Sequence, residues 1–456
     1  MKNKKVVVTL KYYKGELNPF DGAALEAALE AGFTDITAVA MAPESVLPSL
    51  SSLTRLGVRA VLISDPLYAG SDTIVTSYIL ADVISRLQPD LVFCGRQSID
   101  GDTAQVPPML AERLGFGFAN KVVELNDRGE FITRSGDCVD LDSKKVVTFE
   151  RMRTLRFPSM FSKPSDVRVI NNSELMLDRA YVGLSGSPTR VIKAYESTVG
   201  RRACKFIDKG ELSATILEAL KREKKETVAE SGEKLCEVFY LGNLSELAKS
   251  LSNTATEVQY EGRDAQQIAD HLKKCKASVV LFEGNDTLKE LAARVAVICG
   301  AGLCADCISF RVENGKFVMT RPAGGGNITA DIVAVSDMAF ATVKVADNTG
   351  ADLIFSVGKG AISALDRITE LSNEYGAELC ASRIVVDSGK MPYTAQVGLT
   401  GKSVAPSVYV AFGISGAVQH TVGISGARTV IAINNDKKAT IFDYADFGIV
   451  ADINEF

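Results

Sequence analysis

The segment GISGAVQH, residues 413–420, places His420, one of only two histidines in the chain, directly behind a glycine-rich turn. Two more such turns precede it, SVGKGAIS at 356–363 and QVGLTGKS at 396–403. Donors gathered at strand ends suit an anionic or carbonyl-rich ligand in the crevice of an open sheet. This region supplies many of them: Ser382, Arg383, Thr400, Ser415 and Gln419. A histidine taken alone is more often a core residue bonded to the backbone, so its surroundings must decide its role.

None of the three turns is a phosphate-binding loop by pattern. QVGLTGKS has Gln396 where the G-x-x-x-x-G-K-[ST] pattern requires its first glycine, and no turn reads G-x-G-x-x-G. Turns between strands and helices need glycine in any case. The prediction of a binding site therefore depends on the three turns together.

A second candidate site is the polar loop SIDGDTAQV, residues 98–106. It precedes an expected helix whose N-terminus offers free amides to a phosphate. Asp100 and Asp102 in this loop could form an acid pair or a metal pair, but a helix cap with ligand hydrogen bonds is the favoured interpretation. Asn18 and Asp21 stand before another expected helix, LNPFDGAALEAAL at 17–29. They mark either a plain helix start or the opposite wall of a phosphate-binding site formed with the 98–106 loop.

Composition narrows the class of protein. At roughly 150 residues per domain, 456 residues predict about three domains, and 46% hydrophobic residues supply several cores. A net charge of −5 and the absence of tryptophan and of a basic stripe argue against nucleic acid. The apolar runs are too short for a signal peptide or a membrane helix. We expect a cytoplasmic protein without membrane insertion, whose nine cysteines are reduced; the Cys304 to Cys307 C-x-x-C is interpreted as structural.

The chain contains an internal repeat, which predicts an α/β fold. Residues 90–136 and 278–324 each read as a buried strand, a polar loop, a helix and a hairpin turning at a glycine, Gly129 or Gly315. Further alternating strands and helices precede each copy, fewer in the second, and predict parallel sheets. A third α/β unit begins near residue 350. Between the copies, residues 163–233 hold a charged helix interpreted as solvated, followed by a linker.

At this point a resemblance becomes specific. CASRIVVDSG at 380–389, QVGLTGKS and FGISGAVQHTVGISGARTVIAINND at 412–436 resemble the FAD domain of the α subunit of electron transfer flavoprotein. LNPFDGAALEAAL, GRQSIDGDTAQV and GLSGSPTRVIKAYE resemble its β subunit. The resemblance implies a β–α fusion: a β-like domain at 1–225, an abbreviated α-like N-terminal domain at 226–345, and a doubly wound FAD-binding domain at 346–456.

The resemblance also implies which residues contact FAD. His420 would donate to the flavin O2 edge, Thr400 would lie near N5, and Arg383 would lie beside the isoalloxazine ring. Lys359 replaces an arginine, which keeps the charge but loses the bidentate fork and lowers the expected FAD affinity. The full set is Lys359, Ser382, Arg383, Gln396, Val397, Gly398, Leu399, Thr400, Ser415, Gly416, Ala417, Val418, Gln419, His420, Asn434, Asp452 and Ile453.

In the β-like half the resemblance implies a second nucleotide site. It holds AMP in ordinary members of the family and a second FAD in electron-bifurcating members, which DGDTAQV resembles more closely. Pro107 departs from the expected glycine, and LRFPSMFSK, a shortened partner-anchoring segment, has Met160 in place of an anchoring leucine. The implied residues are Asn18, Pro19, Phe20, Asp21, Met41, Asp100, Gly101, Asp102, Thr103, Ala104 and Gln105.

The expected function is that of an electron carrier rather than an enzyme with its own substrate chemistry. FAD would take electrons from a flavoprotein dehydrogenase, of the acyl-CoA dehydrogenase type, and pass them to a second redox partner through a stabilised flavin semiquinone. One alternative is a bifurcating protein that oxidises NADH at a second FAD. Another is a nucleotide-binding regulatory module without a redox role, which would purify colourless.

Overall fold

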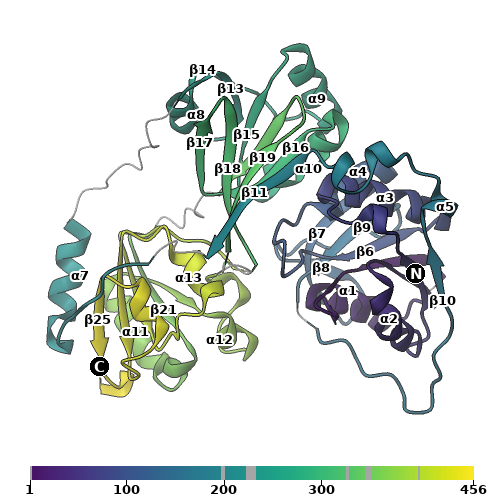
Figure 1. The fold of residues 1–456 in the computed structure, drawn as a ribbon. Helices are drawn as coiled ribbons and strands as arrows, with labels where there is room; N and C mark the ends of the chain where they lie inside the picture. The colour runs from purple at the N-terminus through teal and green to yellow at the C-terminus, as the bar shows by residue number, and fades with distance from the viewer. Residues whose placement is uncertain are drawn as a thin grey trace. The chain divides into compact units, whose positions relative to one another are not determined.

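The computed structural model describes residues 3–151, 153–196, 201–221, 233–324, 328–344, 351–398 and 401–455. The chain forms two compact units, which are described separately (Figure 1). Unit 1 comprises Met1–Lys193, Glu230–Arg321 and Ala330–Val343, and unit 2 comprises Ala194–Ala229, Pro322–Thr329 and Lys344–Phe456. Residues 194–225, assigned from the sequence to the β-like domain, therefore belong to unit 2 in space.

The first part of unit 1 is an eight-stranded sheet in the order β10-β5-β4-β1-β6-β9-β7-β8. All neighbours are parallel except β7 and β8, which form the hairpin predicted around Gly129 (φ +77°). The strands are β1 (Lys5–Leu10), β4 (Asp35–Met41), β5 (Arg59–Ile63), β6 (Leu91–Gly95), β7 (Gly117–Leu125), β8 (Phe131–Thr133), β9 (Lys145–Phe149) and β10 (Val167–Ile170). A short hairpin, β2 (Tyr12–Tyr13) and β3 (Glu16–Leu17), follows β1.

Helices cover both faces of this sheet, so its strands are buried on both sides, as long apolar runs predict. Val6 and Val8 of β1 pack into one core with α1, and Val7 packs into the other core with α3 and α4. This alternation is the two-residue period of a strand. The helices are α1 (Pro19–Glu30), α2 (Leu47–Thr54), α3 (Thr73–Leu87), α4 (Val106–Leu114) and the short α5 (Asn172–Leu175) and α6 (Gly183–Gly186).

The second part of unit 1 repeats the design with a five-stranded parallel sheet, β14-β13-β15-β20-β16. Its strands are β13 (Leu235–Leu241), β14 (Ser252–Glu257), β15 (Val279–Glu283), β16 (Gly302–Cys307) and β20 (Ala339–Val343), and its helices are α8 (Ser245–Leu251), α9 (Ala265–Lys274) and α10 (Asp286–Cys299).

A further sheet has the order β11-β19-β18-β17. Its strands are β11 (Thr189–Glu196), β17 (Ser309–Glu313), β18 (Lys316–Ala323) and β19 (Ile328–Ala334). The predicted hairpin at VENGKF joins β17 and β18, with positive φ at both Asn314 (+52°) and Gly315 (+70°). Two residues of positive φ are the requirement of a type I′ turn, which confirms this part of the repeat.

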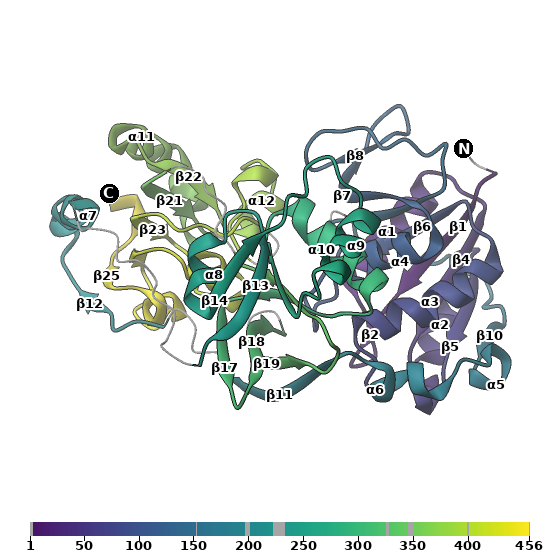
Figure 2. The same cartoon turned by 90° about the horizontal axis from the view of Figure 1, so that it is seen from above.

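The sheet of unit 2 has the order β12-β25-β24-β23-β21-β22, and all its strands are parallel. The strands are β12 (Lys205–Phe206), β21 (Leu353–Val357), β22 (Glu378–Ala381), β23 (Val408–Phe412), β24 (Thr429–Asn434) and β25 (Phe447–Val450). The helices are α7 (Leu212–Lys221), α11 (Leu365–Tyr375), α12 (Arg383–Asp387) and α13 (Val418–Ile424). α11 runs alongside β21 and β22 (Figure 2). The predicted α/β class with parallel sheets is confirmed.

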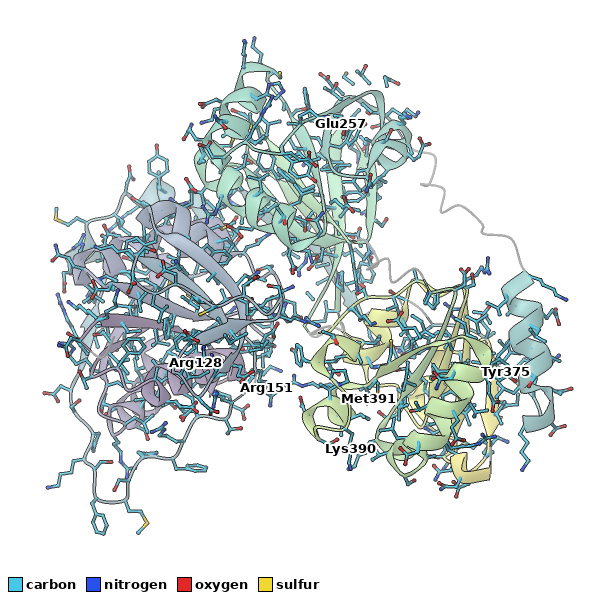
Figure 3. The ribbon with its side chains drawn as sticks, turned by 180° about the vertical axis from the view of Figure 1, so that it is seen from behind. Arg128, Arg151, Glu257, Tyr375, Lys390 and Met391 are labelled. Atoms are coloured by element: carbon cyan, nitrogen blue, oxygen red, sulfur yellow. The ribbon has the colours of Figure 1, made fainter. Side chains whose placement is uncertain are left out.

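Helix α7 is not the fully solvated helix that its charges suggested. Leu212, Ile216 and Ala219 lie on one helical face and are buried in the same core as β21 and β23. Ser213 of α7 also hydrogen-bonds the hydroxyl of Tyr375 at the end of α11 (Figure 3). An apolar stripe at helical spacing explains this burial, and the charge run from residue 222 onward lies outside the described residues. Within the described ranges, no helix is long and apolar enough to cross a membrane.

Candidate functional site

The carboxyl edge of the unit 2 sheet contains the topological switch of a doubly wound fold. β21 lies between β22 and β23, so the chain leaves β21 toward one side and later returns on the other. Ligands of open parallel sheets bind in the crevice at such a point. Five of the six strands, all except β12, end at this edge in or next to residues predicted to contact FAD. Lys359 follows β21, Ser382 and Arg383 follow β22, residues 415–420 follow β23, Asn434 ends β24, and Asp452 and Ile453 follow β25.

The 396–398 segment joins this edge from outside the regular strands. Gln396 forms a parallel bridge with Ala381 at the end of β22, and the Val397 amide donates to the Ala381 carbonyl at 2.9 Å. The next two predicted FAD contacts, Leu399 and Thr400, lie outside the described residues.

Close backbone packing explains the glycines of the three turns. A Cβ on Gly358 would lie 2.3 Å from the Gly413 carbonyl oxygen, and one on Gly413 would lie 2.5 Å from the Ala361 amide. The turns after β21 and β23 therefore touch backbone to backbone at the switch point. Gly398 and Gly423 make a similar contact, which seats α13 against the 396–398 segment. These glycines permit close approach, so glycine content alone did not identify a phosphate cradle.

His420 lies in the first turn of α13 and is only 6% exposed. Its Nε2 is 2.8 Å from the Tyr409 hydroxyl, and its Nδ1 has no hydrogen-bond partner of acceptable geometry among the described residues. Burial lowers the His420 pKa to about 4, although the nearby Val397 backbone offsets part of this effect. The imidazole is therefore neutral at neutral pH and can act as a hydrogen-bond donor but not as a cation.

The other residues predicted to contact FAD at this edge fall into two groups: exposed donors, and residues that hold the neighbouring turns in place. Lys359, Ser415 and Gln419 are exposed donors, and Arg383 bonds Asp387 one helical turn away at 3.1 Å. Asn434 is buried and supports the turn after β23, because its amide donates to the Ile414 carbonyl at 3.0 Å. Asp452 accepts from Asn454, and Ile453 packs into the core. Hydroxyl, amide, guanidinium and ammonium donors together fit a ligand that combines phosphates with ring carbonyls, as FAD does.

Unit 1 contains a cavity of about 450 Å³ at the carboxyl ends of β1 and β6. Seven of the residues predicted to hold a nucleotide line it: Asn18, Asp21, Met41, Gly101, Thr103, Ala104 and Gln105. Pro19, Phe20, Asp100 and Asp102 do not line it. Residues of both segments, 17–29 and 98–106, therefore line the same cavity, where the Asn18 amide donates to the Gln97 carbonyl at 2.9 Å. Asn18 also stands at the N-cap position of α1, so it is a helix start as well as part of the cavity lining.

The structure corrects the interpretation of the acidic pair as helix caps. Helix α4 begins at Val106 with Gln105 as its N-cap, and no side chain caps it. Asp100 pairs with Lys11 at 2.8 Å, and Asp102 accepts from the Gln97 amide at 3.3 Å. Pro107 and Pro108 in the first turn lack backbone N–H groups, so this helix end offers a phosphate fewer amides than expected. No three His, Cys, Asp or Glu side chains in the described ranges are arranged to hold a metal.

Asp21 is the most perturbed acid of the cavity. Its Oδ2 accepts from the Lys11 amide at 2.7 Å and its Oδ1 from the Gly95 amide at 3.0 Å. Burial nevertheless raises the Asp21 pKa to about 7, because these hydrogen bonds only partly replace lost hydration. Gly95 is required here, since a Cβ would lie 2.3 Å from the Asp21 carboxylate.

Several lining residues have no local signal in the sequence, and Arg321 of β18 is the clearest. It is 5% exposed and donates to the carbonyls of Gly101 (2.7 Å) and Asp102 (3.2 Å), which closes the polar loop from the second half of unit 1. Gln105 strengthens this link by donating to the Leu303 carbonyl at 3.4 Å. The other lining residues not predicted include Lys11, Thr73, Thr76, Arg96, Gln97 and Cys304.

Replacing Arg321 with glutamine is expected to speed backbone hydrogen exchange in residues 98–106 at least tenfold, because charged hydrogen bonds that hold the loop contribute about 1.5–3 kcal/mol each. Hydrogen exchange followed by mass spectrometry on peptides that cover this loop measures this. Arg311→Gln is the matched control, since Arg311 pairs with Asp331 at 2.9 Å in the same sheet but does not line the cavity. Equally faster exchange in both variants would contradict the assignment.

One surface segment of unit 1 is unusually apolar. Between β9 and β10 the chain forms a long loop that extends away from the sheet (Figure 1). Phe157, Met160 and Phe161 in this loop are 93%, 88% and 91% exposed. The loop is anchored at its base, where Arg55 donates to the carbonyls of Ser159 (2.9 Å) and Ser162 (3.0 Å). Exposed apolar side chains on an anchored loop are typical of an interaction surface.

Comparison with known proteins gives two family matches. Residues 6–152 and 251–366 match the electron transfer flavoprotein domain, and residues 348–425 match the electron transfer flavoprotein FAD-binding domain. The edge of the unit 2 sheet described above thus lies largely within an FAD-binding domain.

Curated relatives agree with these matches. The electron transfer flavoprotein subunit alpha of Thermoanaerobacterium thermosaccharolyticum is 33% identical over 249 residues, which are 44% of this chain and 74% of the relative. The acryloyl-CoA reductase electron transfer subunit beta of Anaerotignum propionicum is 28% identical over 329 residues, 54% of this chain and 89% of the relative. Protein FixB of Rhizobium meliloti is 32% identical over 225 residues, 39% of this chain and 64% of the relative.

Proposed function

Because the chain belongs to the electron transfer flavoprotein family, we propose that it is an electron carrier. FAD held by residues 346–456 takes electrons from a flavoprotein dehydrogenase and delivers them to a second redox partner. The observation that carries this proposal is the gathering of donors at the β21–β23 switch point, inside the segment that matches the FAD-binding domain. Nine free cysteines suit a reducing compartment, so the proposal includes a cytoplasmic location.

Bound FAD supplies the redox chemistry, and the protein supplies binding, orientation and electrostatics. Lys359, Ser415 and Gln419 offer exposed donors, and the glycines at 358 and 413 let the turns after β21 and β23 approach each other closely. His420 contributes a neutral N–H in a desolvated position. A fixed donor beside the flavin favours the reduced ring over the oxidised ring, because reduction increases the electron density on its carbonyl edge.

We further propose that the chain is a β–α fusion with the domains 1–225, 226–345 and 346–456. The two separate matches to the electron transfer flavoprotein domain and the repeated architecture of unit 1 support this. The unit 1 cavity, which is lined by donors that include Asn18, Thr103 and Gln105, is proposed to hold AMP or a second FAD.

The second-FAD alternative would make the protein an electron-bifurcating one that oxidises NADH. One observation favours it. A hollow of about 400 Å³ at the ends of β4 and β5 shares Met41 and Tyr68 with the main cavity, so the site has room to extend beyond a mononucleotide.

The deciding experiment is to purify the protein, denature it, and quantify the FAD and AMP released per chain by absorbance and mass spectrometry. One FAD and one AMP support the simple carrier. Two FAD make bifurcation the leading interpretation and call for NADH oxidation assays. No flavin, even after incubation with FAD, would overturn the electron-carrier proposal and favour a regulatory module.

The exposed loop is proposed to dock the dehydrogenase. Met160→Ala is expected to slow reduction by a purified acyl-CoA dehydrogenase about tenfold at limiting concentration, since a central apolar anchor contributes about 1–2 kcal/mol to binding. FAD content and redox potential should not change. Met176→Ala is the control, because Met176 is equally exposed (84%) but lies outside the loop. An unchanged rate for Met160→Ala would exclude this residue as the anchor.

A further inference from the structure

The contact between His420 and Tyr409 joins two buried, neutral side chains. Tyr409 lies on β23 with no exposed surface, and its hydroxyl is 2.8 Å from His420 Nε2. Burial raises the Tyr409 pKa well above 10, and burial lowers that of His420. Cys380 also acts on Tyr409, and its own pKa is raised to about 11 by burial, so this thiol is uncharged as well. At neutral pH the imidazole therefore carries one proton, either on Nδ1 or on Nε2.

Counting hydrogen bonds separates these two tautomers. If Tyr409 donates to Nε2, the ring proton is on Nδ1 and is the only donor of the pair still to be satisfied. If Nε2–H donates to Tyr409, the phenol proton must go to the Ser356 hydroxyl, the other side chain in the described part of the chain that hydrogen-bonds this phenol. The bare Nδ1 then has no proton to give to the Val397 backbone, which acts on this ring as an acceptor. An unsatisfied buried polar group costs about 1–3 kcal/mol. The first arrangement is therefore favoured.

The surroundings of Nδ1 point the same way. The Val397 backbone raises the His420 pKa, which is the effect of an acceptor near a ring N–H. Val397 belongs to the 396–398 segment, against which α13 is seated by Gly398 and Gly423. An Nδ1–H would therefore be directed to the segment where FAD is expected to bind.

We propose that Tyr409 is a positioning residue that donates to His420 Nε2 and so holds the imidazole in the Nδ1–H tautomer, as a neutral donor for an electron-rich ring edge. This inference rests on the proposed function, because FAD is the ligand that such a donor would serve. Tyr409 itself has no surface exposed to solvent and would act only through His420.

The tautomer can be measured without FAD. In the full-length protein labelled with ¹⁵N-histidine, His271→Gln leaves His420 as the single imidazole, and long-range ¹H–¹⁵N spectra distinguish the protonated ring nitrogen from the bare one. The expected result at pH 7 is a protonated Nδ1 and a bare Nε2. With Tyr409→Phe, the population of the Nε2–H form relative to the Nδ1–H form should rise at least tenfold. A protonated Nε2 in the parent protein, or no shift in the Tyr409→Phe variant, would overturn the inference.

The redox consequence is measured in the FAD-loaded protein. Tyr409→Phe is expected to reduce the preference for reduced over oxidised FAD about tenfold, which is about 59 mV for a one-electron couple. Tyr444→Phe is the matched control, since Tyr444 is buried in the same unit and has no hydrogen bond to His420 among the described contacts. An unchanged potential would overturn the redox part. Failure to bind FAD at all would overturn the proposed function, whereas the tautomer measurement would still decide the role of Tyr409.

Discussion

Gly416→Ala is expected to destabilise unit 2 by about 2–5 kcal/mol, as the sum of about 1–2 kcal/mol for a left-handed backbone and about 1–3 kcal/mol for overpacking. Gly416 has φ +89°, and its Cβ would lie 2.1 Å from the Ile441 amide and 2.5 Å from the Thr440 carbonyl carbon. These are backbone atoms and cannot rotate away. The turn after β23 would have to move, and with it the residues Ser415 to His420.

Hydrogen exchange followed by mass spectrometry measures this effect on peptides of β23 and β24, separately from unit 1. Gly376→Ala is the control: Gly376 also has positive φ (+65°) but nothing lies within 4 Å of its Cβ. The control should lose only about 1–2 kcal/mol, so the difference between the variants isolates the clash. Similar losses of stability in both variants would show that the turn can move to remove the clash, and would contradict the prediction. FAD content should fall in Gly416→Ala and stay unchanged in the control.

The free energy of unfolding of unit 1 is expected to fall by about 4 kcal/mol between pH 4 and pH 8 through Asp21, at about 1.36 kcal/mol per unit of pKa difference. The pKa of this carboxyl rises from 3.8 to about 7 on folding, because burial disfavours the ionised form. Between these values the folded protein binds more protons than the unfolded chain. The contribution of Asp21 to stability is therefore largest below about pH 4 and is lost as the pH rises through about 7.

Urea unfolding of the parent protein and of Asp21→Asn over this pH range tests the prediction. Asp21→Asn loses part of the hydrogen bonding to Lys11 and Gly95 at every pH. The informative quantity is therefore how the difference in unfolding free energy between the variant and the parent changes with pH. The variant should gain stability relative to the parent as the pH rises. For Asp100→Asn the pH dependence should have the opposite sign, so that this variant loses stability relative to the parent as the pH rises. Burial raises the Asp100 pKa, but the interaction with Lys11 outweighs burial and the net pKa is lowered. Parallel curves for parent and Asp21→Asn would refute the role of Asp21.

Local patterns predicted the elements and the edges that carry the sites. Apolar runs such as Leu91 to Cys94 became buried strands, and the glycines at 129 and 315 took the positive φ that their hairpins require. Donor-rich segments that follow strands were brought to one edge, because parallel strands place all their carboxyl ends together. These features depend on residues close in sequence, so they could be read from it.

Other features depend on residues that are distant in the sequence. The buried face of α7 packs on β21 and β23, which are more than 130 residues away in the sequence, and the partner of Asp100 is Lys11 rather than the end of the helix that Asp100 precedes. The sequence shows which residues are charged, but it does not show which distant residues they contact.

The α/β class, the repeat and the segments that carry the candidate residues follow from the sequence alone, because strand period, helix period and turn conformation are local properties of the chain. The contact of Arg321 with a loop 220 residues away in the sequence and the contact of Tyr409 with His420 arise only in the folded chain. The same holds for the burial that raises the pKa of Asp21 to about 7. Hydrogen-bond partners and burial arise from the packing of distant segments, and these two quantities set the protonation and the donor geometry of a site.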